Sequence, residues 1–424
     1  MTPSASYDQR MPDLRDACAA MFERHRVEAF GGVFHVPDVD TYPALFAWDS
    51  GYHALSLLHL DPDLAVRELS TLYEANRLPG GLLSHQRFIP GSEDVQRFIE
   101  DLFGPMFDGD RTPFIDPPSA AYAAARLSVR VGGSASQLLD AAVAHLRALA
   151  THRVVDGEAL PAVLHPFETG TEGNAFTARL ARSSDTIDVT RFKDLTVSAV
   201  ASGMSPERAR SEGHGFVVYD PTVCGWYLLA LEEVAAASAT YGREADRDWA
   251  RRTADSVADA AVALLWSESD LLFGAYDLVG GRKLGGLGAM GLIPAATAAM
   301  RERGLSAVVA DHHLRPGAPM WGRRGFAAGA VQPGAGVRDF VQWDGNAVWG
   351  ATVYWAHLVA LRLRRLDEAA RLRHQLEELV AQHGFREFYD GWSGEAGGAG
   401  AASGFTWPAL ILEMTAGERL LADE

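Results

Sequence analysis

The sequence predicts an all-α fold of the (α/α)6 toroid or barrel type, with long loops between its helix pairs. Apolar residues recur with helical spacing along most of the 424 residues, which suggests about eleven or twelve helices. The helices come mostly in pairs, and neither a β-rich block nor a strand–helix–strand alternation interrupts them. Because no change of composition marks a boundary, we expect residues 1–424 to form a single domain.

Capping and stop signals define the predicted helices of the N-terminal half. Asp61-Pro62 provides an N-cap and a proline at the first helical position, and the glycine pair 80–81 is expected to end that helix. Residues 84–116 and 156–215 are predicted to be long loops, although the phenylalanines of the first segment argue against disorder. The other helices predicted here cover residues 13–29, 43–59, 119–131 and 136–150.

Similar signals divide the C-terminal half. Asp220-Pro221 starts a helix that is expected to reach Tyr241. Residues 273–281 are predicted to form a hairpin or loop, and residues 304–342 and 391–404 are predicted to be loops because glycine is frequent in them. The remaining predicted helices cover residues 243–266, 289–303, 346–365 and 367–383, with a last helix from about Trp407.

Charge and cysteine content exclude several classes of partner. The formal net charge is -17, whereas nucleic acids and anionic membranes are bound by basic surfaces, so neither is an expected partner. Cys18 and Cys224 lie far apart and form no CxxC motif, which argues against a disulfide framework or a zinc site. The N-terminus lacks an apolar signal core, and no stretch is long enough to span a membrane. We therefore expect a cytoplasmic protein.

Familiar cofactor and metal motifs are missing or weak. Residues 286–291 match GxGxxG, but no strand precedes them, so we interpret them as a loop that leads into a helix. Asp311-His312-His313 has no third ligand at a suitable spacing and is interpreted as a surface loop. HExxH, GxSxG and P-loop sequences are absent. We expect neither a cofactor nor a metal.

Acidic residues beside tryptophans recur in four segments at helix ends. Any one of them is more often a buried aromatic with a capping carboxylate. Four on one helical ring indicate a carbohydrate site, because aromatic rings stack on sugars and glycoside hydrolysis needs two carboxyl groups with hydrogen bonds around them. The segments are FAWDSGYHA (46–54), HPFETGTEGNAF (165–176), FVQWDGNAVW (340–349), and FREFYD with the GE and GFTW that follow it (385–407).

At these residues the chain resembles glycoside hydrolase family 63, especially its smaller bacterial members, which hydrolyse α-linked glucosyl or mannosyl glycerate. It is also distantly similar to the family 37 trehalases. The resemblance extends in order over nearly the whole chain. It is carried by FAWDSGYHA with its flanks, RLPGGLLSH, DPPSAAYA, AYDLVGG, GLIPAATA, REFYDGWSGE and GFTWPAL.

The resemblance implies an (α/α)6 barrel and an inverting mechanism with one acid and one base. The base corresponds to Glu387, and Glu395 is the runner-up. The acid position, an aspartate in the family, is occupied here by Glu172. Such a site requires about 6.5–9.5 Å between the carboxyl groups to fit a water. Burial or a neighbouring carboxylate would have to raise the pKa of Glu172.

Two departures from the family pattern bear on the substrate. The Trp-Arg-Gly-Pro-x-Trp of the family reads WDGNAVW at residues 343–349, and the Gln before its Pro-Pro is Asp116. The missing arginine removes a positive charge that could hold a carboxylate. We therefore expect a neutral or cationic substrate rather than one with an acidic aglycone such as glycerate.

The leading hypothesis is an α-glycoside hydrolase for a small glucoside, mannoside or sugar-like substrate, with Glu172 as acid and Glu387 as base. Trp48 and Trp407 would stack on the sugar, and Asp49 and Asp344 would bind its hydroxyls. The predicted substrate-binding residues are Tyr42, Trp48, Asp49, His53, His85, Gln86, Trp343, Asp344, Trp349, Glu395 and Trp407.

Two alternatives stay open at this point. The same toroid could carry a sugar epimerase, isomerase or lyase, for which a histidine pair from among His53, His85, His165 and His214 would be needed near the pocket. Alternatively, the altered acid segment and the missing arginine could belong to a non-catalytic homologue that binds a carbohydrate or a protein.

Overall fold

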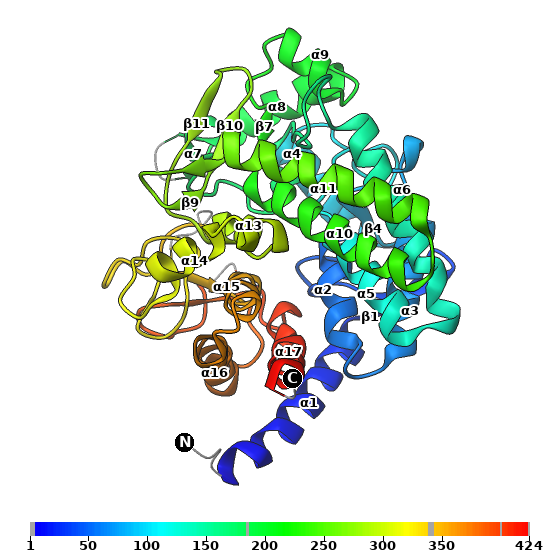
Figure 1. Ribbon diagram of the computed structural model, residues 1–424. Helices are drawn as coiled ribbons and strands as arrows, with labels where there is room; N and C mark the ends of the chain where they lie inside the picture. The colour runs from blue at the N-terminus through cyan, green and yellow to red at the C-terminus, as the bar shows by residue number, and fades with distance from the viewer. Residues whose placement is uncertain (1–4, 184–185, 338–342, 399–400, 423–424) are drawn as a thin grey trace.

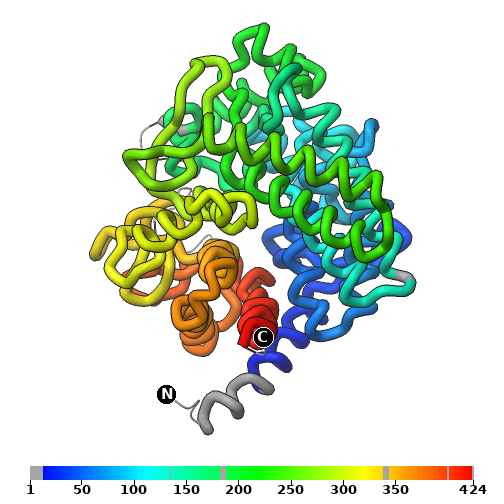
Figure 2. The backbone as a smooth tube through the Cα atoms, viewed as in Figure 1, coloured from blue at the N-terminus to red at the C-terminus, as the bar shows by residue number. Residues whose placement is uncertain are grey.

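A closed ring of helices organises the chain. The computed structural model describes residues 5–183, 186–337, 343–398 and 401–422. Six of the described helices pack each against the next, and the last returns to the first, so that α17 lies beside α2 (Figures 1 and 2). These inner helices are α2 (Ala47–Leu57), α5 (Ser119–Val131), α10 (Pro221–Thr240), α12 (Leu292–Ala295), α15 (Gly350–Arg362) and α17 (Ile411–Ala422).

Outer helices follow the inner ones along the chain. Every residue of α2 is buried, whereas α11 buries a stripe that includes Ala250, Ala254, Val257 and Ala261. A helix that is covered on all sides belongs to the interior, and one with a single buried stripe belongs to the outside. The outer helices that follow α2, α5, α10, α12 and α15 are α3 (Pro62–Ala75), α6 (Gln137–His152), α11 (Glu244–Leu264), α13 (Ala298–Glu302) with α14 (Leu305–Val309), and α16 (Leu366–His383).

Close backbone contact between inner helices depends on glycine. A Cβ atom on Gly51 would lie 2.5 Å from the Ser119 hydroxyl and 2.6 Å from the Ala120 nitrogen. The absent side chain therefore lets α2 and α5 approach each other closely. Ser119 uses this proximity, because its hydroxyl donates a hydrogen bond of 2.7 Å to the Trp48 carbonyl.

Short strands lead directly into three inner helices. Strand β3 (Ala44–Phe46) precedes α2, β7 (Val218–Tyr219) precedes α10, and β12 (Ala347–Trp349) precedes α15. Strand β3 pairs with β4 (Gln86–Phe88), and β12 pairs antiparallel with β13 (Phe388–Asp390). This pairing fixes the segments around residues 86 and 388 against the N-terminal ends of inner helices. The other pairs are β1 (Arg26–Ala29) with β2 (Gly32–His35), β10 (Ala275–Asp277) with β7 and β11 (Arg282–Leu284), β5 (Arg182–Ser183) with β6 (Thr186–Ile187), and β8 (Trp266–Ser267) with β9 (Leu272–Phe273).

Several predicted boundaries are confirmed. The Asp61 side chain accepts a hydrogen bond of 3.0 Å from the Leu64 amide, as an N-cap should. Asp220 caps α10 in the same way. The segment 273–281 enters a hairpin of β10 and β11. Residues 286–291 are a loop and a short turn that lead into α12.

Other boundaries were wrong, and tertiary contacts explain most of them. The first helix, α1 (Ala5–His25), stops before residue 29 because residues 26–29 pair with β2. Helix α3 ends at Ala75, before the glycine pair, where the Asn76 side chain donates to the Ser84 carbonyl. The predicted helix 289–303 is broken, because Thr297 caps a new start at α13. The predicted helix 346–365 begins as strand β12.

The two predicted long loops contain helices. Helix α4 (Glu93–Phe103) places Val95, Ile99 and Phe103 at intervals of four, which is a helical stripe among acidic residues. Helices α7 (Ala178–Ala181), α8 (Val189–Ala201) and α9 (Pro206–Ser211) lie within residues 156–215. Helix α8 packs against α4. Residues 304–342 were also not all loop, since α14 continues into a π-helical turn at Ala310–Leu314.

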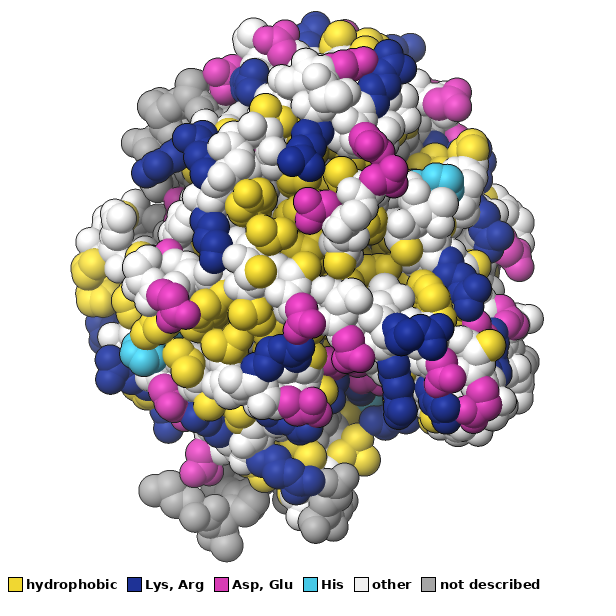
Figure 3. All heavy atoms as spheres, turned by 45° about the horizontal axis from the view of Figure 1, so that its top comes forward, with side chains coloured by type: hydrophobic (Ala, Val, Ile, Leu, Met, Phe, Trp, Pro, Cys, Tyr) yellow, Lys and Arg dark blue, Asp and Glu magenta, His cyan; other side chains and the backbone are white. Residues whose placement is uncertain are grey.

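Basic and acidic side chains are interspersed over one face of the molecule, with hydrophobic side chains between them (Figure 3). The acidic net charge therefore forms no single patch on that face. Within the described residues, no helix is both long and apolar enough to cross a bilayer.

A buried ion pair holds the segment that precedes Glu172, the predicted acid. Glu168 and Arg153 are fully buried, with 2.7 Å between Glu168 Oε1 and Arg153 Nη2. The Ile115 and Leu164 amides also donate to Glu168, at 3.0 and 2.6 Å. One carboxylate thus joins the end of α6, the segment before α5 and the turn at Pro166–Thr169.

We predict that Arg153→Met lowers the free energy of unfolding by about 3–5 kcal/mol, because it leaves the Glu168 charge buried without its partner. Urea denaturation measures this change. The matched control is Arg208→Met in the exposed Arg208–Glu212 pair, which should change stability by about 0.5 kcal/mol or less. Equal effects in the two variants would contradict this account of the segment.

Candidate active site

A cavity of about 120 Å³ lies at the N-terminal ends of α2 and α15. Glu172 and Glu387, the two predicted catalytic residues, both line it. We call it the inner cavity. Its wall also includes Tyr42, Trp48, Asp49, His85, Trp343, Trp349 and Trp407 from the predicted set.

Glu387 lies immediately before β13 and is held by two hydrogen bonds. The Tyr42 hydroxyl donates to Oε1 at 2.7 Å, and the Ala402 amide donates to Oε2 at 2.8 Å. Burial raises the pKa of Glu387 to about 7, although both hydrogen bonds act in the opposite direction. Its ionised form therefore has two donors ready to stabilise it.

Glu172 faces the inner cavity from the segment that follows the buried Glu168. Its pKa is raised to about 7, chiefly by burial and also by the charge of Glu387, while hydrogen bonds from its own backbone amide and from the Trp343 side chain oppose the shift. Gly170, at a φ of 64°, brings this segment against Trp48, since a Cβ there would lie 2.8 Å from the indole ring. Glu172 and Glu387 are thus electrostatically coupled across one cavity.

Four tryptophans form most of the apolar wall. Trp343 and Trp349 stack with ring centroids 4.1 Å apart, and Trp407 meets Trp48 edge to face at 4.8 Å. Such rings offer faces for the C–H surface of a sugar and exclude water from nearby carboxyl groups.

Two further carboxyl groups belong to this environment. The Trp407 indole donates a hydrogen bond of 2.6 Å to Asp49 Oδ1, and burial raises the pKa of Asp49 to about 8. Asp116 accepts from the Trp48 amide at 3.1 Å, and burial together with the charge of Asp49 raises its pKa well above the usual range. No lysine or arginine belongs to the described lining of the inner cavity. Its acidic groups are therefore driven toward their neutral forms.

The remaining predicted substrate-binding residues do not line the inner cavity. Gln86 lines a neighbouring cavity rather than the inner one. His53 is also placed away from the inner cavity: it is buried in the core, with Nδ1 3.2 Å from Glu68 and Nε2 2.7 Å from the Thr406 hydroxyl. His53 therefore supports Thr406, next to Trp407, instead of contacting the cavity.

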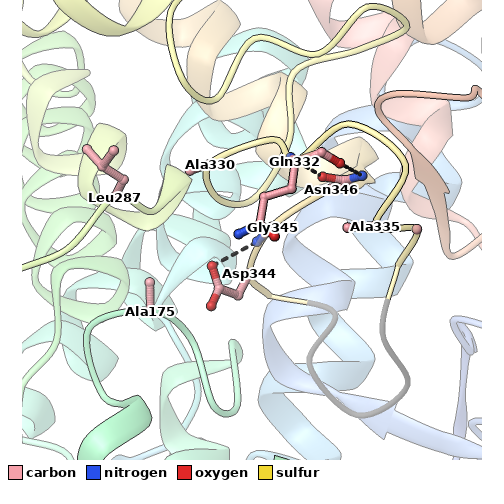
Figure 4. Close-up of a pocket in the computed structure, with 9 residues that line it drawn as sticks. Ala175, Leu287, Ala330, Gln332, Ala335, Asp344, Gly345 and Asn346 are labelled. Atoms are coloured by element: carbon pink, nitrogen blue, oxygen red, sulfur yellow. Dashed lines mark hydrogen bonds between the residues drawn. The ribbon is translucent and has the colours of Figure 1, made fainter. Parts of the chain in front are cut away.

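Asp344 and Glu395 are also not brought to the inner cavity. Asp344 lines a different pocket together with Gln332 and Asn346 (Figure 4). Its Oδ1 accepts from the Gly345 amide at 2.8 Å. Glu395 is exposed in the loop after β13. Their contact with substrate stays a prediction, since neither residue lines the inner cavity. Residues 340–342, which precede Asp344 in the same segment, lie outside the described part of the chain.

Among the described residues, the inner cavity is not lined by the histidine pair that a proton-transfer alternative needs. His85 is the histidine among its described lining residues. His165 stacks on Phe114 at 4.7 Å, and His214 bonds to the Leu164 carbonyl at 2.8 Å. Both belong to the packing around the Glu168 segment.

Sequence reasoning missed several wall residues. Phe46, Phe405 and Pro37 line the inner cavity, but apolar residues carry no chemical signal of a site. Asp116, which is buried and bonded to the Trp48 amide without lining the cavity, was noticed only as a departure from the family pattern. Within the described residues, no group of three or more histidines, cysteines, aspartates or glutamates is arranged to hold a metal ion.

Comparisons with known proteins agree with one another. Residues 42–408 match the family described as the mannosylglycerate hydrolase MGH1-like glycoside hydrolase domain. The mannosylglycerate hydrolase of Rubrobacter radiotolerans is 25% identical over 90% of this chain and 92% of the relative. That of Thermus thermophilus is 24% identical over 90% of this chain and 96% of the relative.

Solved structures show the fold. A family 63 mannosylglycerate hydrolase from Thermus thermophilus in complex with glucose matches with a TM-score of 0.76 and 21% identity, over 95% of this chain and all of that chain. The neutral trehalase of Saccharomyces cerevisiae matches with a TM-score of 0.56 and 15% identity, over 96% of this chain and 81% of that chain.

We predict that Asp49→Asn stabilises the protein at alkaline pH. The pKa of Asp49 in the folded protein, about 8, lies above the ordinary aspartate value of 3.8. The parent therefore loses stability as pH rises from about 4 to about 8, whereas asparagine stays neutral. At pH 9 the free energy of unfolding of the variant should exceed that of the parent by on the order of 2 kcal/mol.

Thermal or urea unfolding from pH 4 to pH 9 measures the difference between variant and parent. The control is Asp63→Asn, at an exposed position in the first turn of α3, for which the difference should not grow with pH. A difference for Asp49→Asn that is independent of pH would contradict the assignment of a strained buried carboxyl.

Proposed function

The chain belongs to the mannosylglycerate hydrolase MGH1-like glycoside hydrolase family and is a glycoside hydrolase, and from this premise we propose that it inverts the anomeric centre of a small α-glycoside. Glu172 is the general acid and Glu387 is the general base. The observation that carries the proposal is the meeting of these two carboxyl groups, each with a pKa of about 7, in one tryptophan-walled cavity.

The roles follow from what stabilises each protonation state. Tyr42 and the Ala402 amide both donate to Glu387, so its ionised form is supported and can accept a proton from water. The negative charge of Glu387 is one of the causes that raise the pKa of Glu172. We assign the proton of the active pair to Glu172, because the ionised form of Glu387 has these two donors.

In the reaction, one proton passes from Glu172 to the aglycone and another passes from water to Glu387. Glu172 donates its proton to the oxygen that leaves with the aglycone, and the bond from this oxygen to the anomeric carbon breaks. A water on the opposite face forms the new bond to that carbon and gives its proton to Glu387. Exchange with solvent afterwards returns the two carboxyl groups to their starting states. The glutamate in place of the family aspartate still supplies an acid of suitable pKa.

The ring of inner helices supports an (α/α)6 toroid that forms one domain over residues 1–424. Six described inner helices close on themselves, and the outer helices follow them along the chain. In this arrangement the strands that precede α2 and α15 direct Trp48, Asp49 and Trp349 toward the open end of the ring.

The relatives are named mannosylglycerate hydrolases, and one solved relative was crystallised with glucose. We infer that an α-mannosyl or α-glucosyl ring occupies the inner cavity of this chain. Trp343 and Trp407 would contact its faces. Asp49, in its neutral form, could donate a hydrogen bond to a sugar hydroxyl while it accepts one from Trp407.

We predict that Glu172→Gln loses activity on only one of two substrates, whereas Glu387→Gln loses activity on both. Fluoride leaves without needing a proton, so Glu172→Gln should hydrolyse an α-glycosyl fluoride within about tenfold of the parent. The same variant should lose about 10²–10⁴ in kcat/KM on a methyl α-glycoside. Glu387→Gln should lose activity on both, because water activation is needed in each case. Steady-state kinetics with released fluoride and released sugar measure these rates.

Glu395→Gln is the matched control, since this exposed glutamate lies in the same loop region and should keep both activities. A Glu387→Gln variant as active as the parent would remove the base assignment.

We also predict a narrow bell-shaped dependence of kcat/KM on pH, centred near pH 7 for the parent. Activity rises as Glu387 ionises and falls as Glu172 ionises, and the pKa of each is about 7. This bell shape applies to the methyl α-glycoside. With the glycosyl fluoride, both the parent and Glu172→Gln should show the acidic limb alone, because fluoride leaves without a proton from Glu172. An alkaline limb that persists with the fluoride would assign that limb to a group other than the acid.

A further inference from the structure

A second cavity of about 260 Å³ opens beside the inner one, and we call it the outer cavity. Helix α4 contributes Val95, Ile99 and Phe103 to its wall. Three further phenylalanines, Phe46, Phe88 and Phe167, contribute from other segments. The apolar stripe of α4 therefore lines this cavity.

The two cavities meet at the acid. Glu172 lines both of them, as do Tyr42, Phe46 and His85, whereas Glu387 lines only the inner cavity among the described residues. In an inverting hydrolase the acid protonates the oxygen between sugar and aglycone, and the base lies on the far side of the sugar. If Glu172 is the acid, this oxygen lies at the junction, the sugar in the inner cavity and the aglycone in the outer cavity.

The outer cavity offers no counter-charge to an anionic aglycone. Its described lining contains no lysine or arginine. Arg87 lies between two lining residues of β4, but strand alternation directs it away, and it bonds to Asp110 at 2.9 Å. Burial lowers the pKa of His85 to about 3, so its ring is neutral. A carboxylate placed here would be desolvated beside Glu172 without an opposite charge among the described lining residues.

We propose that the outer cavity is the aglycone subsite and that it takes an uncharged apolar aglycone, such as a medium-chain alkyl or arylalkyl alcohol, in place of glycerate. The proposal rests on the function proposed above, because it requires Glu172 to protonate the leaving oxygen. It distinguishes this chain from the relatives named for mannosylglycerate.

The test compares α-glycosides that share one sugar and differ in the aglycone: methyl, n-hexyl, 2-phenylethyl and glyceric acid. The alkyl and arylalkyl alcohols have similar acidity, so differences among them report binding rather than leaving-group chemistry. Both the α-mannosyl and the α-glucosyl series are measured. We expect kcat/KM for the hexyl glycoside to exceed that for the methyl glycoside at least about thirtyfold, and to exceed that for the glycerate glycoside.

Phe103→Ala should lower the ratio of hexyl glycoside to glycosyl fluoride kcat/KM at least tenfold. Ile99→Asn, a second variant on the same stripe, should lower this ratio as well. Phe98→Ala is the control, because Phe98 lies on the same helix and is 61% exposed, and it should leave the ratio unchanged.

The outcomes separate the two proposals. Equal rates on methyl and hexyl glycosides, or preference for the glycerate glycoside, would overturn the apolar aglycone while leaving hydrolysis intact. A parent enzyme that does not hydrolyse the glycosyl fluoride would instead overturn the hydrolytic assignment on which the inference rests.

Discussion

The desolvation of carboxyl groups is the constraint on which this site depends. Asp49, Asp116, Glu172 and Glu387 all have pKa values raised chiefly by burial. A buried charge without partners costs several kcal/mol, so each group is either kept neutral or given donors. The protein provides the Tyr42 hydroxyl, the Trp407 indole and two backbone amides for this purpose. The same burial that opposes folding at alkaline pH brings two carboxyl groups to a pKa at which one can give a proton and the other can take one.

The architecture explains how residues that are far apart in sequence come to lie around one cavity. Tyr42 and Glu387 are 345 residues apart in sequence and share a hydrogen bond. Their proximity follows from the closure of the ring, in which α17 packs against α2 and the segment before α17 supplies Trp407. Behind the cavity, the Glu68 carboxylate is hydrogen-bonded to both His35 and His53. These bonds fix α2 against α3 and β2. The cavity wall is thus supported by a polar network of residues that do not themselves line the cavity.

Residue type and order were enough to predict part of this site. Trp48, Asp49, Glu172, Glu387 and Trp407 combine aromatic rings and carboxyl groups at helix ends, and the structure brings all five to one cavity. The position of His53 could not be predicted, because its partner Glu68 looks like an exposed helix residue until the tertiary fold buries it. The position of Asp344 could not be predicted either, because a residue can follow a wall tryptophan and still face another pocket. The stripe of α4 was hidden by the acidic residues between its apolar positions, and only packing shows that it covers a cavity.

The central claim is that Glu172 and Glu387 act from opposite faces of the sugar, which requires inversion at the anomeric carbon. Proton NMR of the first product formed from an α-glycoside, recorded before the sugar equilibrates in water, tests this most directly. The account predicts that the β-anomer appears first and that the α-anomer grows only at the rate of spontaneous mutarotation. Initial release of the α-anomer would require a covalent intermediate and a nucleophile in place of a base, and would contradict the roles assigned to the two glutamates.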